Sequence, residues 1–226
     1  MTDFLKKIIV LYQRIWRPNH VVISGIKIYS GPQVPKKIRR QLFKFRHETE
    51  ELQYLPSLIE KGDCVIECGA GIGATTAMIG KIVGSKSLIS LEPNANAHNI
   101  IHKTLDLNGV STRVRSQAIS CDEKGLDIYM MVNWLSSSST QRSDEAVKVH
   151  VQTTTLQKLQ HELNANVLVI DVEGAEVEVL TEESLQGFAK LLIEFHPHIV
   201  GEKSANELKS NLLSWGFENI SPLEPN

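Results

Sequence analysis

The sequence has few cysteines and no long apolar run. A membrane-spanning helix needs about 20 mostly apolar residues, and no stretch approaches that length, so we expect no membrane span. The N-terminal apolar stretch is short and interrupted, and no small-residue cleavage site follows it, so we expect no signal peptide. Three cysteines cannot all pair, and Cys64 and Cys68 fall within one expected strand, which is too stiff to bridge them. Reduced thiols and a cytoplasmic location are therefore expected.

Internal repeats are also lacking, and the only low-complexity tract is Ser136–Ser139. The 226 residues are 42% hydrophobic and 22% charged, which is ordinary for a globular chain and excludes wholesale disorder. This length suits one large domain, or one domain with an N-terminal extension.

The net charge of −2 conceals an uneven distribution along the chain. Residues 1–47 hold 11 of the 24 Lys and Arg residues but one of the 26 Asp and Glu residues, Asp3. The remainder of the chain is therefore acidic. We predict that the basic segment forms a helical lid or docking element that recruits an anionic acceptor or partner, and we do not expect nucleic acid to be that partner.

The patterns in the first 58 residues predict a mostly helical extension. Apolar residues at helical spacing predict an amphipathic helix over residues 4–16, which could pack on its own domain, on a partner or on a membrane surface. Residues 21–29 have the pattern of a short strand or hairpin arm, and residues 35–59 that of a helix. We therefore divide the chain into an extension, residues 1–58, and a main domain, residues 59–226.

From residue 62 onward, short apolar runs alternate with segments of helical periodicity. This alternation predicts an α/β fold with an open, mostly parallel sheet and helices on both faces. The expected strands cover residues 64–69, 87–92, 114–120, 126–133, 147–155, 166–171, 190–195 and 217–221. The expected helices cover residues 74–84, 95–109, 155–163, 175–187 and 204–216.

A glycine loop joins the first of these strands to the first helix, in the string VIECGAGIGATT. Gly69, Gly71 and Gly73 permit a tight turn and a close approach of the backbone to a ligand, as at nucleotide-binding junctions. The spacing also satisfies the relaxed dinucleotide pattern, so a nicotinamide-dependent enzyme stays open. Glu67 completes the pattern E-x-G-x-G-x-G, which resembles motif I of the class I methyltransferases, and an acid here suits the cationic sulfonium of their cofactor, S-adenosylmethionine, better than a pyrophosphate. Glu92 ends the next strand, 19 residues after Gly73, where an acid binds ribose hydroxyls.

With these motifs in place, the chain resembles the FkbM family of S-adenosylmethionine-dependent methyltransferases over roughly residues 62–217. The resemblance is carried, in order, by the strings VIECGAGIGATT, LEPNANAHNIIHKTLDLN, SQAIS, LVIDVEGAEVEVL and LLIEFHPH. It implies a Rossmann-like class I methyltransferase fold with a seven-stranded, mostly parallel sheet whose last strand is reversed. It also implies methyl transfer, usually to oxygen, on sugars, polyketides or peptides. Glu67 and Gln157 stand where the family commonly has Asp.

The resemblance and the positions of the motifs together predict which residues bind the cofactor. The glycine loop, the end of the second strand, the third strand and the acid after NVLVI all fall at one edge of a parallel sheet, and the third strand often holds adenine in class I enzymes. The predicted cofactor-binding residues are Glu67, Gly69, Ala70, Gly71, Gly73, Thr75, Glu92, Pro93, Asn94, Gln117, Ala118 and Asp171.

The acceptor side of the site must position an atom about 3 Å from the methyl group, in line with the breaking bond. A hydroxyl acceptor also needs a general base. The catalytic candidates are Asp171, Glu173 and His196, with His196 the preferred base because it titrates near neutral pH. A structural role in the loops stays an alternative for Glu173 and His196. The expected substrate contacts are Trp134, Ser137, Ser138, His196 and His198.

We do not expect a metal, although oxygen-rich side chains follow the strands. Asp171, Glu173, Glu194 and His196 could ligate Mg²⁺ or a similar hard cation, as in methyltransferases that lower the pKa of the acceptor with a metal. Their spacing in the sequence, however, is not diagnostic of a metal site, and the cysteines lack zinc-binding spacing.

The function favoured by these features is that of an S-adenosylmethionine-dependent O-methyltransferase. Its acceptor would be a hydroxyl or carboxylate of a small-molecule, sugar or peptide natural product. The alternatives are an RNA ribose methyltransferase and a non-catalytic Rossmann-fold adaptor. Base methylation is disfavoured because Asp171 and Glu173 would repel phosphate. The sequence is compatible with a homodimer.

Overall fold

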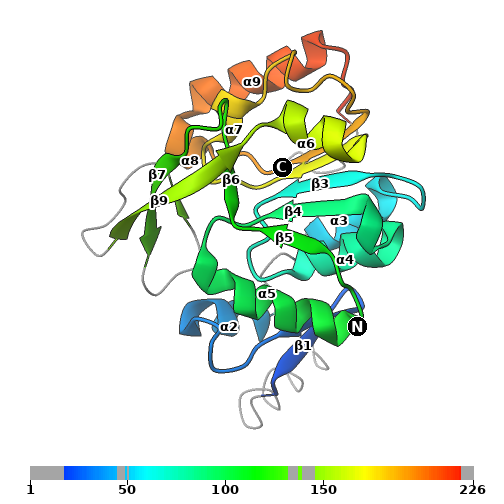
Figure 1. Ribbon diagram of the computed structural model, residues 1–226, viewed down its shortest axis with the longest axis vertical. Helices are drawn as coiled ribbons and strands as arrows, with labels where there is room; N and C mark the ends of the chain where they lie inside the picture. Colours follow the sequence, from blue (N-terminus) through cyan, green and yellow to red (C-terminus); the bar gives the residue numbers. More distant parts are fainter. Residues whose placement is uncertain (1–17, 45–48, 50, 132–136, 139–145, 220–226) are drawn as a thin grey trace.

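The computed structural model describes residues 18–44, 49, 51–131, 137–138 and 146–219 (Figure 1). Its strands are β1 (His20–Ile23), β2 (Ile26–Tyr29), β3 (Val65–Cys68), β4 (Leu88–Leu91), β5 (Arg113–Arg115), β6 (Gln117–Ile119), β7 (Leu126–Met131), β8 (Ser137–Ser138), β9 (Ala146–Thr154), β10 (Val167–Ile170) and β11 (Lys190–Ile193). Its helices are α2 (Lys36–Leu42), α3 (Glu51–Leu58), α4 (Ala74–Val83), the 3₁₀-helix η1 (Ser85–Ser87), α5 (Ala95–Asn108), α6 (Leu156–Leu163), α7 (Glu176–Val179), α8 (Pro197–Val200) and α9 (Glu202–Ser214). The helix predicted over residues 4–16 lies outside the described residues.

A five-stranded parallel sheet in the order β11-β10-β3-β4-β5 forms the centre of the molecule. This confirms the predicted α/β fold with a mostly parallel sheet. The predicted number of seven strands is not reached in this sheet within the described ranges. The last expected strand, residues 217–221, has no regular structure over residues 217–219, and its remainder is not described. Phe217 is half-buried and packs against the hydrophobic core beside α9.

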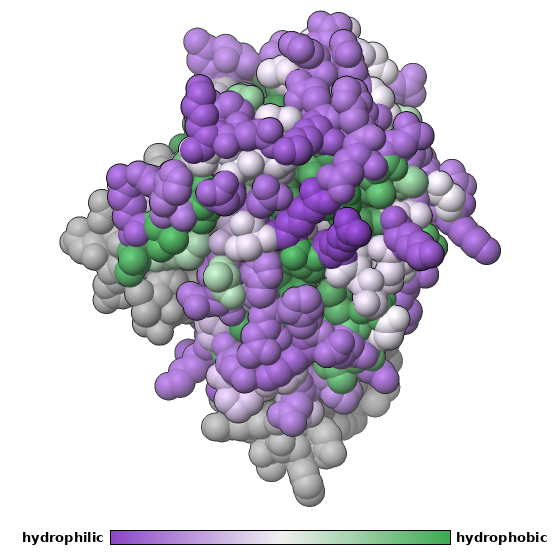
Figure 2. Space-filling view, in the orientation of Figure 1, coloured by the Kyte–Doolittle hydropathy of each residue, from purple (hydrophilic) through white to green (hydrophobic). Residues whose placement is uncertain are grey.

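Residues along the central strands alternate between two hydrophobic cores, one on each face of the sheet. On β3, Val65 joins the core formed with α4 and α5, whereas Ile66 joins the core formed with α6 and α9. Because both faces are covered, the strands are continuous apolar runs. Figure 1 shows these helices as layers on either side of the sheet. In Figure 2, hydrophilic residues cover most of the face in view, and hydrophobic residues gather between the two layers.

Residues 114–120, predicted as a single strand, are divided between two sheets. β5 pairs with β4 in the central sheet, but β6 pairs with β9 in a second sheet of the order β6-β9-β7-β8. The chain changes sheet because β4 ends opposite Arg115, after which the backbone of β9 supplies the partners for residues 117–119. The predicted pair of strands around a polar loop is confirmed by β7 and β9, which pair antiparallel.

A β-hairpin, β1 and β2, precedes the central sheet. Its turn residues Ser24 and Gly25 have φ angles of 48° and 80°, a combination that matches the twist of a two-residue hairpin. Ile26 and Ile28 are buried in the core that α4 and α5 share. The described part of the extension therefore packs into the core of the main domain, while its function as a lid stays a prediction.

Two predicted helices are shorter than the sequence indicated. The helix expected over residues 35–59 is divided, because α2 ends in a turn before α3 begins. The helix expected over residues 175–187 ends at Val179, because Thr181 and Ser184 exchange side-chain-to-backbone hydrogen bonds and start a series of turns. Throughout the described ranges, no helix combines the length and apolarity needed to cross a bilayer.

Candidate active site

The carboxyl ends of β3, β4, β10 and β11 meet at one edge of the central sheet. β3 pairs in parallel with both β4 and β10, and β11 pairs in parallel with β10. The glycine loop, Glu92, Asp171 and Glu194 directly follow these strands and therefore lie along one edge. Open α/β sheets bind their ligands in this position.

The glycine loop makes a turn that depends on the absence of a side chain. Gly69 has a φ of 100°, and a Cβ atom there would lie 2.0 Å from the backbone carbonyl oxygen of Asp171. The backbone N–H groups of Gly69 and Ala70 both donate to the carbonyl of Leu91, at 3.0 Å. Gly73, with a φ of 83°, leads directly into α4. The loop is thus held between the ends of β4 and β10, as glycine alone allows.

Glu67 lies beneath this loop rather than on its surface. Its side chain is buried, and its two carboxylate oxygens accept hydrogen bonds from the hydroxyls of Thr75 and Thr76 at 2.5 and 2.7 Å. These bonds fasten the first turn of α4 to β3. The sequence predicts that Glu67 and Thr75 contact the cofactor, and the structure gives both residues a role in holding the loop that would do so.

Glu92 connects the end of β4 to the glycine loop. One carboxylate oxygen accepts a hydrogen bond from the N–H of Gly71 at 3.0 Å, and the other accepts one from the N–H of Asn94 at 2.8 Å. A ring nitrogen of His98 lies 2.7 Å from the backbone carbonyl of Glu92. Asn94 is itself buried and caps α5 by accepting from the N–H of Asn96. The acid predicted to bind ribose is therefore fixed in place by the loop.

The other predicted cofactor residues lie near the same edge. Pro93 is half-buried between Glu92 and Asn94. Gln117 and Ala118 belong to β6, where both are half-buried, and β6 follows β5 after a single residue. They lie in the second sheet rather than in the central one, because the chain changes sheet at this point.

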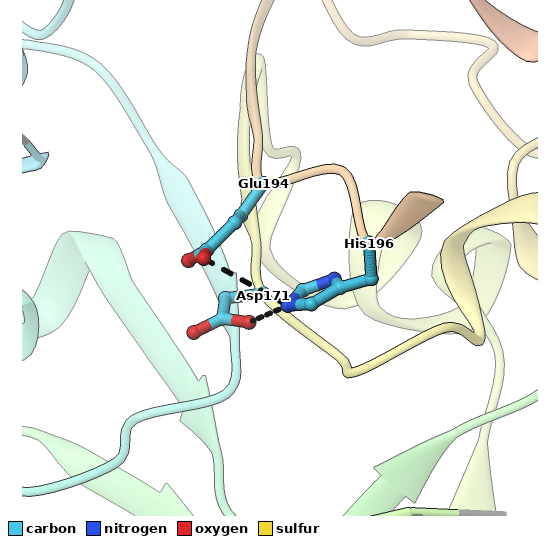
Figure 3. Close-up of side chains that lie close together, drawn as sticks. All are labelled: Asp171, Glu194 and His196. Atoms are coloured by element: carbon cyan, nitrogen blue, oxygen red, sulfur yellow. Dashed lines mark ion pairs between the residues drawn. The ribbon is translucent and has the colours of Figure 1, made fainter. Parts of the chain in front are cut away.

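Asp171, Glu194 and His196 form a cluster at the ends of β10 and β11 (Figure 3). Nε2 of His196 lies 3.3 Å from Oδ1 of Asp171 and 3.8 Å from Oε1 of Glu194. The side chains of Asp171 and Glu194 are 48% and 46% exposed, whereas that of His196 is 5% exposed. Figure 3 shows the two carboxylates converging on one edge of the imidazole ring. The carboxylates therefore form the open side of the cluster and the ring its buried side.

Glu176 is a site residue that the sequence does not single out. It is fully buried, and its carboxylate accepts hydrogen bonds from the N–H of Gly174 at 2.8 Å and the N–H of His196 at 2.9 Å. Oε1 also lies 3.4 Å from Nδ1 of His196. Glu176 thus joins the turn after β10 to the turn after β11. It belongs to the string DVEGAE, but its residue type does not distinguish it from the exposed Glu178.

The pKa values of His196 and Glu176 are both shifted by their surroundings. Burial lowers the pKa of His196, but Glu176, Asp171 and Glu194 raise it by more, so the pKa lies above its ordinary value. Burial raises the pKa of Glu176, but the hydrogen bonds from His196 and the backbone outweigh it and hold that pKa below its ordinary value. The cluster therefore favours a positive charge at the imidazole, and a ring that is already protonated is less available as a general base than the sequence suggests.

The remaining predicted residues lie apart from this cluster. Glu173 has a φ of 52° in the turn before Gly174, and its carboxylate is not one of the three grouped donors. His198 is exposed, with its ring centroid 5.7 Å from that of His196. Trp134 lies outside the described residues. Ser137 is described as backbone alone, in β8, and so is Ser138.

The strand order, the glycine loop after β3 and the acid after β4 define a Rossmann-like α/β protein with its ligand site at the carboxyl edge of the sheet. The profile of the methyltransferase FkbM domain matches residues 67–218, a range that contains every predicted site residue. The chain belongs to the FkbM methyltransferase family, which confirms the resemblance inferred from its sequence. A comparison with curated proteins found no significant match.

Proposed function

We propose that the protein transfers a methyl group from S-adenosylmethionine to an oxygen atom of a small molecule, sugar or peptide. Membership of the FkbM family supports methyl transfer in general. The observation that carries the proposal further is the contact between the glycine loop and the end of β10, where Gly69 packs against the carbonyl of Asp171. Through this contact, the loop expected to bind the cofactor adjoins the cluster of Asp171, Glu194 and His196.

The described residues fit this cofactor, which supplies a methyl group activated by the sulfonium. Glu92 accepts hydrogen bonds from the N–H groups of Gly71 and Asn94, which fixes its carboxylate at the end of β4, the position at which an acid binds ribose hydroxyls. Gly69 and Gly71 keep side chains out of the loop. Gln117 and Ala118, at the neighbouring end of β6, are the residues we assign to the adenine.

We assign to Asp171 the role of accepting the proton that the acceptor hydroxyl loses. Methylation of a hydroxyl forms an O–CH₃ bond as the S–CH₃ bond breaks, and the hydroxyl proton leaves. Asp171 is half-exposed at the open side of the cluster, whereas the ring of His196 is buried behind it. We therefore assign His196 the supporting role of sharing the proton with Asp171 and orienting its carboxylate.

The charge of the cluster favours a hydroxyl acceptor over a carboxylate or a phosphate. Asp171 and Glu194 present two carboxylates at the open side. An anionic group brought next to them would be repelled, as would the phosphates of an RNA. A neutral hydroxyl instead donates its proton to them as a hydrogen bond.

Transfer of labelled methyl groups tests the proposed function. The chain is incubated with methyl-labelled S-adenosylmethionine and separate fractions of small molecules, peptides and RNA. We expect label in a small-molecule or peptide fraction, lost in the Glu92→Ala variant and stable to mild base, because a methyl ether survives where a methyl ester is hydrolysed. Base-labile label would contradict a hydroxyl acceptor. Nuclease-sensitive label would support the RNA alternative, and cofactor binding without transfer to any fraction would support the adaptor.

A further inference from the structure

The cluster at the ends of β10 and β11 brings together donor atoms of two chemical types. Ile170 and Ile193 are paired in register at the ends of these strands, so Asp171 and Glu194, which directly follow the two strands, lie side by side. One ligand atom from each of Asp171, Glu194 and His196 lies within 4.8 Å of the other two. A nitrogen and two carboxylate oxygens at this separation are close enough to contact one ion.

The orientation of His196 is a second, independent observation that points to a ligand. Its ring is at least nine-tenths buried, and Nδ1, on the side of Glu176, has no hydrogen-bond partner of normal geometry among the described residues. With the carboxylate of Glu176 on the Nδ1 side, a neutral ring would carry its proton on Nδ1 and its lone pair on Nε2, where it can act as a ligand. Here Nε2 faces the oxygens of Asp171 and Glu194. When the ring is neutral, that lone pair faces two anionic oxygens, and a cation bound between them would relieve the repulsion in place of a second proton on the ring.

We propose that Asp171, Glu194 and His196 bind a divalent cation, with Glu176 orienting the imidazole from behind. One imidazole nitrogen and two carboxylates suit Mg²⁺ or Mn²⁺, which keep their other coordination positions for water or a ligand oxygen. This departs from the expectation of no metal, because the donors lie on two separate segments and converge only when β10 and β11 pair. Glu173, which the sequence grouped with them, is not one of the donors.

The role of the cation in catalysis rests on the proposed function, whereas its binding does not. Asp171 adjoins the glycine loop through the Gly69 contact, so a cation here lies on the acceptor side of the cofactor loop. A hydroxyl oxygen bound to it would have a lowered pKa. With the cation bound, Nε2 of His196 would be a ligand and would no longer share the proton, so the carboxylate of Asp171 alone would take the proton from the acceptor. The acceptor would then be one whose hydroxyl can coordinate a metal.

Binding of Mn²⁺ to the metal-stripped full chain, without cofactor, tests the proposal. The electron paramagnetic resonance signal of free Mn²⁺ reports the bound fraction in the wild type, in Glu194→Gln and in Glu182→Gln. Glu182 is an exposed glutamate in the turns after α7 and serves as the matched control. We expect one tight Mn²⁺ per wild-type and Glu182→Gln chain, displaced by Mg²⁺, and affinity lower by at least about tenfold in Glu194→Gln.

A second measurement on the wild type does not depend on how any variant folds. Bound Mn²⁺ should broaden the ring-proton resonances of His196 and leave those of the exposed His20, on β1, sharp. Three results would each overturn the proposal: no binding of Mn²⁺ by the folded chain, equal affinity in Glu194→Gln, or broadening centred on another histidine. If the folded chain binds no Mn²⁺, a protonated His196 is the source of positive charge in the cluster. S-adenosylhomocysteine binding in the presence of a chelator separates the two proposals. If S-adenosylhomocysteine binds and Mn²⁺ does not, the cation site alone is refuted. If Mn²⁺ binds and S-adenosylhomocysteine does not, the proposed function alone is refuted.

Discussion

The backbone N–H of His196 donates a 2.9 Å hydrogen bond to the fully buried carboxylate of Glu176. The same carboxylate accepts from the N–H of Gly174, so one buried acid holds the turns that follow two neighbouring strands. Asp171 and Glu194, which form the open side of the cluster, lie on these two segments. The geometry of the open side therefore depends on a residue that does not face the acceptor.

Replacing Glu176 by Gln should destabilise the protein strongly. The variant keeps the size of the side chain but replaces one carboxylate oxygen by an NH₂ group, which cannot accept from the N–H of Gly174 or of His196, and a buried donor left without its partner costs about 1–3 kcal/mol. Glu178→Gln, two residues further along and exposed, is the matched control and should change the unfolding free energy by less than about 0.5 kcal/mol. Urea denaturation of both variants measures the difference. Equal stability of the two would show that Glu176 has no such role.

Replacing Gly69 by Ala should damage both the fold and the cofactor site. The new Cβ atom would lie 2.0 Å from the carbonyl oxygen of Asp171, so the loop or the end of β10 must move. Gly62→Ala is the control, because Gly62 also has a positive φ, of 109°, but no atom lies within 4 Å of the position of its Cβ. The control should lose about 1–2 kcal/mol for backbone strain alone.

Denaturation and calorimetry with S-adenosylhomocysteine should therefore separate the two glycine variants. Gly69→Ala should lose more stability than Gly62→Ala and should also bind the ligand more weakly. If both variants lose the same stability and keep wild-type affinity, the contact between the loop and β10 does not shape the site.

The glycine loop and its neighbours could be predicted from sequence because their signals are local. A strand that runs into Gly69, Gly71 and Gly73, followed by an acid at the end of the next strand, is visible in a short window. The sheet edge then follows from the rule that ligands bind at the carboxyl ends of parallel strands. The helices after β3 and β4 were predicted correctly for the same reason, since their periodicity and their terminal glycines are local.

The features that could not be predicted depend on partners distant in the sequence. Nothing within residues 114–120 indicates that β4 ends opposite Arg115 while β9 continues the pairing, so the division into two strands could not be predicted. Glu176 differs from Glu178 in burial, which is decided by the turn that carries His196. The convergence of Asp171 with Glu194 likewise requires the register of β10 with β11.

The hydrogen bond between Glu67 and Thr76, beneath the glycine loop, should be measurable as a coupling energy between the two residues. Glu67 accepts from the hydroxyl of Thr76 at 2.7 Å, and both side chains are buried. Thr76→Val removes the donor and leaves a buried carboxylate with one partner fewer, which should cost about 1–3 kcal/mol. In a double-mutant cycle with Glu67→Gln, the two effects should differ from additivity by at least about 0.5 kcal/mol. Strictly additive effects would mean that this bond does not fasten α4 to β3.

Asp63, near the amino ends of the central strands, should make the free energy of unfolding depend on pH. Its carboxylate accepts from the N–H of Glu60 and from the side chains of Asn166 and Lys190. Burial raises the pKa of Asp63, but these bonds lower it by more, so the folded value lies below the ordinary one. As pH falls, the unfolded chain is therefore protonated first. The stabilisation is complete above about pH 4 and is lost as pH falls through the folded pKa.

Asp63→Asn should accordingly lower the unfolding free energy by about 1–3 kcal/mol at pH 7. The difference from the wild type should shrink as the pH is lowered below about 4. Asp106→Asn, at an exposed position of α5, serves as the control and should show no such convergence. A difference that stays constant with pH would contradict the assignment of the stabilising charge to Asp63.

Calorimetric titration with S-adenosylhomocysteine tests the central claim, that the glycine loop and Glu92 form a cofactor site, most directly. The wild type should bind one molecule per chain, with a dissociation constant on the order of micromolar. Glu92→Ala should bind at least about tenfold more weakly, because charge-assisted hydrogen bonds are lost, while Glu182→Ala should bind as the wild type does. Absence of binding by the folded wild-type chain, or unchanged affinity in a folded Glu92→Ala variant, would contradict the claim.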